Sequence, residues 1–134
     1  MVRVMADNDV KGQLTELIRL LASGWGNLFS DLRVVVETFD TLGLSNKAND
    51  SEVWQKCQSE DVILFTGNRN GDGPTSLELT IRQHNQPDSL PVITLGNPRR
   101  FTLDRAYAER AADQFLGYLL DLGVYRGAGR LYVP

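Results

Sequence analysis

The sequence predicts a three-layer α/β/α domain with a mainly parallel central sheet of four to five strands. Short apolar, β-branched segments alternate along the chain with longer segments in which apolar residues recur every three or four positions. Strands that alternate with helices connect through right-handed crossovers, so the strands run parallel and helices cover both faces of the sheet. A chain of 134 residues is large enough for one hydrophobic core. We therefore expect a single domain over residues 1–134.

The first half of the chain contains both strand-like apolar runs and apolar residues at helical spacing. Leu14, Leu17 and Leu21 recur at helical spacing, and the glycines within residues 23–27 end that helix. The three consecutive valines at 34–36 are typical of a strand that is buried on both faces. The expected elements are a strand over 2–6, a helix over 13–22, a strand over 32–38, a helix over 52–58 and a strand over 61–66.

The second half adds further helices and strands. Pro74 suits the start of a helix, because its missing N–H would have no partner there. The Gly-Asn-Pro sequence at 96–98 ends a fourth strand, and residues 131–133 of the glycine-rich tail 123–134 could add a short edge strand. The expected elements are a helix over 77–84, a strand over 91–95 and a long helix over 103–122.

Composition narrows the classes of function. A net charge of −3 argues against a broad nonspecific nucleic-acid binder, although it does not exclude a nuclease. Cys57 and His84 are the only residues of their types, which excludes an intrachain disulfide and a cysteine-based zinc site. Apolar runs are too short to span a membrane and no secretion signal is recognised, so we expect a cytoplasmic protein. Five arginines could form a local strip that guides a nucleic-acid backbone: Arg99, Arg100, Arg105, Arg126 and Arg130.

Three polar clusters lie just after an expected strand or at the start of an expected helix. We expect all three to lie at one edge of the sheet. In open parallel sheets, ligands bind beyond the carboxyl ends of the strands, where the strand order reverses. If the order is 2-1-3-4, the cluster after the first strand neighbours the cluster after the third, and the helix that begins near residue 50 starts at the same edge. The clusters are Asp7-Asn8-Asp9, Asn49-Asp50-Ser51-Glu52 and Asn68-Arg69-Asn70-Gly71-Asp72.

A divalent metal ion would explain why carboxylates gather at this edge. Carboxylates at close range raise each other's pKa unless a cation neutralises them. Magnesium and manganese prefer oxygen ligands, keep several waters and leave room for substrate phosphates. The candidate metal ligands are Asp7, Asp9, Asp50, Glu52, Asn68, Asn70 and Asp72.

Structural roles explain several of the same residues. Asp9 could cap the first helix, and Asn49 or Asp50 could cap the helix that follows, with Glu52 as a favourable charge in its first turn. The loop over 66–73 has the composition of a simple turn. Asp7 is harder to explain in this way, because an aspartate that ends a central strand is costly to bury without a partner.

The motifs Met5-Ala6-Asp7-Asn8-Asp9, Asn49-Asp50-Ser51-Glu52 and the segment 63–70 resemble, in order and spacing, those of the PIN-like domains, especially their short toxin-related branch. The likeness covers roughly the first hundred residues. It implies a Rossmann-like PIN fold and a ribonuclease that depends on Mg²⁺ or Mn²⁺, often the toxin of a toxin–antitoxin pair. One departure is that Asn68 and Asn70 stand where the family has aspartates, and neutral ligands bind a hard cation less strongly. Either Asp72 compensates or the site is degenerate.

The resulting hypothesis is metal-assisted hydrolysis of a phosphodiester. RNA would be the substrate, and an antitoxin protein is a candidate partner. We expect no association with a membrane, and the chain could form a homodimer. The alternatives are a catalytically degenerate PIN-like scaffold that binds RNA or a protein and, ranked last, a phosphoacceptor receiver domain, which lacks the required aspartate after the third strand. The proposed catalytic residues are Asp7, Asp50, Glu52 and Asn68, and the proposed substrate-binding residues are Arg69, Arg99 and Arg100.

Overall fold

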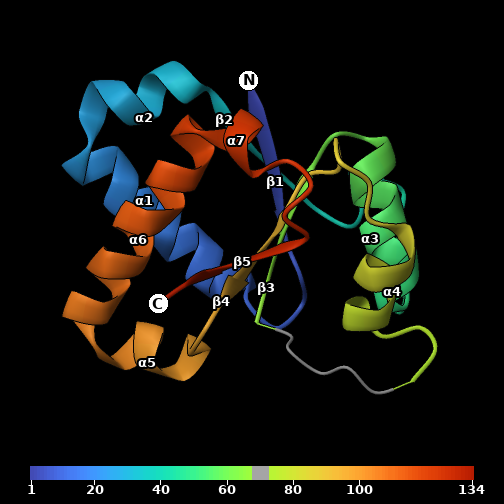
Figure 1. Ribbon diagram of the computed structural model, residues 1–134. Coiled ribbons are helices and arrows are strands. Elements are labelled where there is room, and N and C mark those ends of the chain that lie inside the picture. The colour runs from blue at the N-terminus through green and yellow to red at the C-terminus, as the bar shows by residue number, and fades with distance from the viewer. Residues whose placement is uncertain (68–72) are drawn as a thin grey trace.

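A parallel sheet lies between two layers of helices in the computed structural model, which describes residues 1–67 and 73–134 (Figure 1). Five strands form within these described residues: β1 (Val2–Ala6), β2 (Val34–Glu37), β3 (Ile63–Thr66), β4 (Val92–Leu95) and β5 (Arg130–Val133). The helices of the same residues are α1 (Lys11–Gly24), α2 (Gly26–Leu32), α3 (Asp50–Ser59), α4 (Leu77–His84), α5 (Pro98–Leu103), α6 (Arg105–Leu120) and α7 (Leu122–Tyr125). This arrangement confirms the predicted three-layer α/β architecture.

The strand order is β2-β1-β3-β4-β5, and all neighbouring pairs run parallel. The order 2-1-3-4, the condition under which the first and third clusters would be neighbours, is therefore present, and the tail adds β5 beside β4 as the expected edge strand. Register pairs Met5 with Leu64 and Phe65 with Ile93, so the carboxyl ends of β1, β3 and β4 meet at one edge of the sheet.

Each face of the sheet has its own hydrophobic core, because side chains alternate along a strand. Val4 of β1 packs toward α1 and α6, whereas its neighbour Met5 packs toward α3 and α4, and both are fully buried. In the first core the rings of Phe65 and Phe115 meet edge to face, with centroids 5.6 Å apart. Figure 1 shows α1, α2, α5 and α6 on one side of the sheet and α3 and α4 on the other.

The valine-rich strand was predicted in the wrong environment. β2 is an edge strand, and Val35 and Val36 are 38% and 48% exposed, so the expectation of burial on both faces is wrong. A run of β-branched residues favours a strand without fixing its place in the sheet. α2, which was not predicted, contains no buried residue and is joined to β2 by Arg33 in a left-handed conformation with φ of 51°.

The predicted helix over 77–84 is confirmed as α4; Ser76 is its cap, and Pro74 lies in the turn before it. Pro98 instead occupies the first turn of α5, where Asn97 accepts a hydrogen bond from the N–H of Arg100. The expected helix over 103–122 corresponds to α6, which begins two residues later because Asp104 caps it by accepting a hydrogen bond from the N–H of Tyr107. The short helix α5 before it was not predicted. Within residues 1–67 and 73–134, the helices do not have the length and hydrophobicity of a membrane span.

Phe115→Ala tests the core on the α1 and α6 side. Removal of a fully buried ring that contacts Phe65 should lower the free energy of unfolding by about 3–5 kcal/mol. Leu120→Ala is the matched control, because Leu120 ends the same helix and is 47% exposed; its cost should be about 0.5 kcal/mol or less. Urea titration of the two variants measures both values, and equal losses would contradict this core.

Candidate functional site

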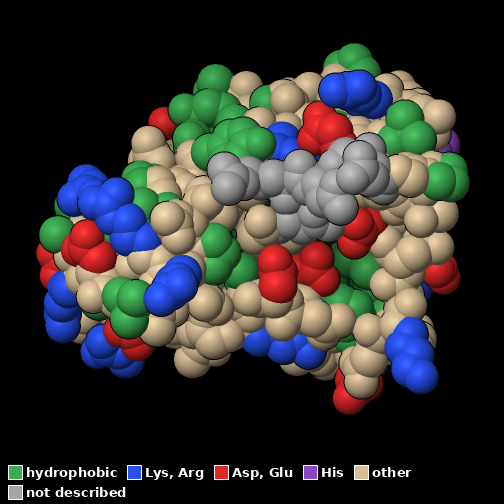
Figure 2. Space-filling view, turned by 90° about the horizontal axis from the view of Figure 1, so that it is seen from below, with side chains coloured by type: hydrophobic (Ala, Val, Ile, Leu, Met, Phe, Trp, Pro, Cys, Tyr) green, Lys and Arg blue, Asp and Glu red, His purple; other side chains and the backbone are tan. Residues whose placement is uncertain are grey.

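The carboxyl edge of the sheet holds the candidate site. After β1 the chain crosses to β2 on one side, and after β3 it crosses to β4 on the other, so the strand order reverses between β1 and β3. Ligands in parallel sheets bind at such a point. Figure 2 looks onto this edge from below and shows Asp and Glu side chains in the middle of the face.

Asp7 lies directly beyond β1 and is held in place by its neighbours. Its backbone N–H donates to the carbonyl of Phe65 at 2.8 Å, which extends the pairing of β1 with β3. Its carboxylate accepts hydrogen bonds from the backbone N–H of Asn8 at 2.8 Å and from the hydroxyl of Thr66 at 3.2 Å. The half-buried carboxylate is thus fixed at the centre of the sheet edge.

Burial raises the pKa of Asp7 above its usual value of 3.8. The Asn8 and Thr66 hydrogen bonds oppose this rise, whereas the charges of Asp9 and Asp50 add to it. The structure therefore brings together Asp7, Asp9 and Asp50, three of the predicted ligands, closely enough for their charges to interact. Cys57 is a buried neighbour whose pKa is raised to about 12, mainly by burial and also by the charge of Asp7, so its thiol is not a nucleophile at neutral pH.

Asp9 does not cap the first helix, so that structural explanation of it is wrong. α1 follows Val10, with no side-chain hydrogen bond at its start. The Asp9 carboxylate instead lies against Gly67, just after β3: a Cβ added to Gly67 would come within 2.9 Å of Asp9 Oδ2 and 2.8 Å of the Pro98 ring. Absence of a side chain at Gly67 therefore lets the starts of α1 and α5 approach the end of β3.

Two residues of the second cluster, Asn49 and Glu52, have a structural role at the start of α3. Asn49 caps α3 by accepting from the N–H of Glu52 at 2.9 Å, and the Glu52 carboxylate accepts from the N–H of Asn49 at 3.2 Å. This reciprocal capping box explains Glu52 without a metal. Asp50 is the first residue of α3 and is half-buried. Its charge contributes to the raised pKa of Asp7.

Sequence reasoning missed a row of polar residues beside Asp7. Thr66 and Thr94 are neighbours in register on β3 and β4, and both are fully buried. Arg130 of β5 donates to the Thr94 hydroxyl at 2.7 Å and pairs with Glu78 of α4 at 3.1 Å. A threonine near the end of each of two apolar strands was the available signal.

The predicted basic groups fall into different environments. Arg100 lies in the first half of α5, at the site edge, but pairs with Asp104 at 3.2 Å and stacks over the Tyr107 ring at 4.9 Å. Arg99 beside it is exposed. The three other arginines of the predicted strip each form an ion pair: Arg105 with Glu109 of the same helix, Arg126 with Asp61, and Arg130 with Glu78 of α4.

The third cluster lies entirely outside the described residues, with the predicted ligands Asn68, Asn70 and Asp72 and the predicted substrate-binding residue Arg69. Within residues 1–67 and 73–134, no three Asp, Glu, His or Cys side chains are grouped closely enough to hold a metal ion. The carboxylates near Asp7 are nevertheless the kind of oxygen donors that magnesium and manganese take, a few at a time, together with water and substrate phosphates.

Comparison of the chain with family models, with curated proteins and with solved structures found no match.

The pKa of Asp7 predicts a pH-dependent effect of Asp7→Asn. Between pH 3.8 and the raised pKa, the folded state binds more protons than the unfolded state, so metal-free stability falls as the pH rises through this window. Asparagine carries no charge and keeps an oxygen for the N–H of Asn8. The variant should melt at a higher temperature than wild type, and the difference should grow with rising pH above 3.8 and then level off. Thermal unfolding in chelator across this range measures it; a pH-independent difference would contradict the raised pKa.

Asn49→Ala tests the capping box. Loss of the cap should reduce the free energy of unfolding by about 1 kcal/mol. Asn49→Ser is the matched control, because serine caps helices about as well as asparagine. Chemical denaturation distinguishes the two variants, and an Asn49→Ala chain as stable as wild type would show that the cap does not stabilise α3.

Proposed function

We propose that this chain hydrolyses phosphodiester bonds in RNA with the help of Mg²⁺ or Mn²⁺, as its resemblance to PIN-like nucleases implies. The observation that carries the proposal is the Asp7 carboxylate, which is held at the strand-order reversal although burial, Asp9 and Asp50 all disfavour its charge. A bound divalent cation would offset that unfavourable charge.

The donor chemistry at this edge fits such an ion. Asp7, Asp9 and Asp50 would supply carboxylate oxygens from the end of β1, from the loop before α1 and from the start of α3. A bound Mg²⁺ or Mn²⁺ would activate water and stabilise charge that develops on the phosphate. Such chemistry needs no protein nucleophile, in agreement with the high pKa of Cys57.

The remaining residues would hold the metal ligands and the substrate in position and would not take part in the chemical step. Thr66 and the backbone of Asn8 hold the Asp7 carboxylate in one orientation through their hydrogen bonds. Glu52, committed to the start of α3, would maintain the position of Asp50 rather than bind metal. Exposed Arg99 on α5 is better placed than the paired Arg100 to contact a substrate phosphate.

Under this proposal the chain would act in the cytoplasm, with an antitoxin protein as its natural partner. The second candidate function is a catalytically degenerate PIN-like scaffold that binds RNA or a protein at the same edge. It is favoured by one observation: the described residues contain no complete group of metal ligands.

A manganese titration by calorimetry tests the proposal without any assumption about RNA sequence. Wild type should bind Mn²⁺, and Asp7→Asn should lose most of that binding, because it removes the central carboxylate. Glu52→Gln is the control: its amide oxygen can still accept from the N–H of Asn49, so binding should be retained. No binding by wild type, or equal binding by all three proteins, would contradict the proposed site.

An assay on single-stranded RNA then separates the two candidate functions. An active enzyme should cleave RNA with Mn²⁺ and should not cleave in chelator, with Asp7→Asn inactive. Metal binding or RNA binding without cleavage would instead support the degenerate scaffold.

A further inference from the structure

A groove between α1, α5 and α6 lies at the same end of the molecule as the candidate site. Its volume is about 560 Å³, within the range of about 300–1,000 Å³ that small-molecule sites occupy in proteins. Figure 1 shows α5 beside the first turns of α1 and α6, at the end of the sheet where β4 finishes. We call it the α5 groove; the residues that matter most for its chemistry are Gly12, Gln13, Thr102, Leu103 and Arg105.

The α5 groove combines an apolar floor with a polar rim. Leu20, Phe101 and Ala108 are buried and form the floor, whereas Leu103 is 74% exposed. The Gln13 amide donates to the Thr102 hydroxyl at 3.4 Å, and its carbonyl oxygen accepts no hydrogen bond within residues 1–67 and 73–134. An apolar surface beside a hydrogen-bonding amide suits a flat ring that carries polar groups on its edge.

Gly12 keeps the groove open. It lies in the first turn of α1 and its φ is not positive, so the backbone does not require glycine at this position. A Cβ added to Gly12 would meet nothing within 4 Å, so close packing does not require glycine either. Because Gly12 lines the groove, a large side chain at this position would extend into it.

The groove begins close to a proposed metal ligand. Pro98, the first residue of α5, and the carboxylate of Asp9 both lie against Gly67 at the end of β3. Phe101 and Thr102 follow Pro98 by one helical turn, a rise of about 5–6 Å. An RNA base next to a phosphate at the metal site can therefore reach the groove.

Exposed arginines beside the groove suit the phosphates of the same strand. Arg105 lines the groove and pairs with Glu109 at 2.9 Å, but the two side chains are 71% and 57% exposed, so the pair is weak and a phosphate can replace the carboxylate. Arg99 is exposed on α5. A ligand that combines a ring with negative charge fits this surface better than an apolar side chain of a protein.

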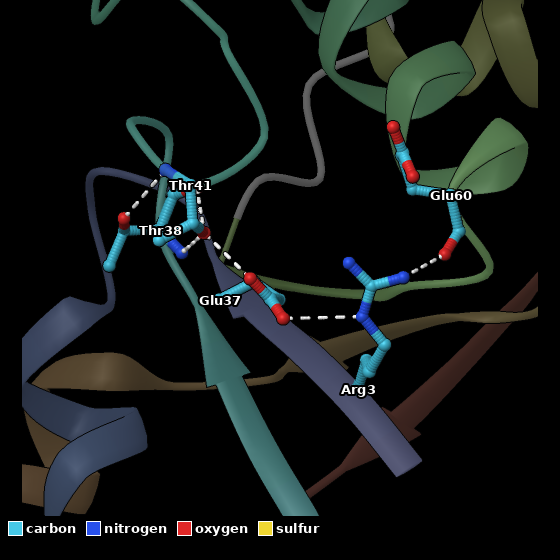
Figure 3. Close-up of polar contacts among 5 residues, drawn as sticks. All are labelled: Arg3, Glu37, Thr38, Thr41 and Glu60. Carbon is cyan, nitrogen blue, oxygen red and sulfur yellow. Dashed lines mark hydrogen bonds and ion pairs between the residues drawn. The ribbon is translucent and has the colours of Figure 1, made fainter. Parts of the chain in front are cut away.

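The charged cluster in Figure 3 provides a contrast, because the chain itself uses its polar groups. Both carboxylate oxygens of Glu37 accept hydrogen bonds, one from Arg3 at 3.2 Å and the other from Thr41 at 2.7 Å. Arg3 also donates to the carbonyl of Glu60. These bonds hold the turn after β2 and the end of α3 against β1, which is a structural role.

We infer that the α5 groove binds an unpaired base of the RNA substrate, next to the phosphate that the metal site would hydrolyse. Unpaired bases present hydrogen-bond donors and acceptors on their edges, and the Gln13 amide, which carries one of each, would bind such an edge. The inference rests on the proposed function for the identity of its ligand.

Fluorescence anisotropy of a labelled, short single-stranded RNA, added to the full chain in chelator, tests the groove without metal or cleavage. Gly12→Phe should fill the groove and weaken binding by about tenfold or more. Gly12→Ala is the matched control: it adds one methyl group in open space and should bind like wild type. Thermal unfolding should show both variants folded. A Gly12→Phe chain that binds as tightly as wild type would overturn the inference. Absence of RNA binding by wild type would also overturn it and would favour an apolar segment of a partner protein as the occupant.

A second comparison tests whether the groove recognises the base and does not fill it. Wild type should bind the RNA more tightly than an oligomer of the same length without bases. Gln13→Ala should lose about tenfold in affinity for the RNA and should bind the abasic oligomer like wild type. Gln114→Ala removes an exposed amide of α6 that does not line the groove, and it should keep both affinities. Equal binding of the two oligomers by wild type, or an unchanged RNA affinity of Gln13→Ala, would contradict base recognition.

These measurements separate this inference from the proposed function. If wild type binds no Mn²⁺ but Gly12→Phe still loses affinity for RNA, the metal site fails and the base-binding groove stands. If Mn²⁺ binding and cleavage hold but Gly12→Phe cleaves RNA with the KM of wild type, the groove alone is overturned.

Discussion

Burial of β1 and β3 between two apolar layers is the constraint on which the rest of the structure depends. Val4 and Met5 are fully buried on opposite faces, as are Ile63 and Leu64, so neither strand can slide or turn over without exposing a hydrophobic row. Because both strands run in the same direction, the residues that follow them must meet at one edge. Asp7 is brought to the interior of that edge by the packing of the residues before it.

This constraint explains which parts of the fold the sequence predicts. The strands predicted over 2–6 and 61–66 correspond to β1 and to β3, which begins at Ile63, and both are apolar except for Arg3 and Thr66. The error at β2 arises because Val34, Val35 and Val36 satisfy β propensity equally well at an edge. The start of α6, two residues later than expected, depends on one cap, Asp104, whose side chain accepts a hydrogen bond from the N–H of Tyr107.

The candidate site was predictable in its location and less so in its membership. Topology places Asp7, Asp9 and Asp50 at one edge, and this follows from the order of elements alone. Spacing alone could not show which of these polar residues stabilise the start of a helix, because Asn49, Asp50 and Glu52 all suit the start of α3. The threonines near the ends of two apolar strands were a local signal, but the contacts of Thr66, Thr94 and Arg130 depend on register between strands that are distant in sequence.

Glu52 and Asp7 show how a structural carboxylate differs from one that needs another explanation. Glu52 receives a hydrogen bond within a complete capping box, is exposed to water, and is fully accounted for by the stability of α3. Asp7 receives two hydrogen bonds, yet burial and two neighbouring carboxylates still raise its pKa. An asparagine would keep an acceptor for Asn8 without a charge, so stability of the isolated chain does not explain the aspartate. A cation bound at this edge would offset the repulsion between Asp7 and its neighbouring carboxylates and the cost of burying its charge. We therefore base the proposed function on Asp7 rather than on the number of acidic residues around it.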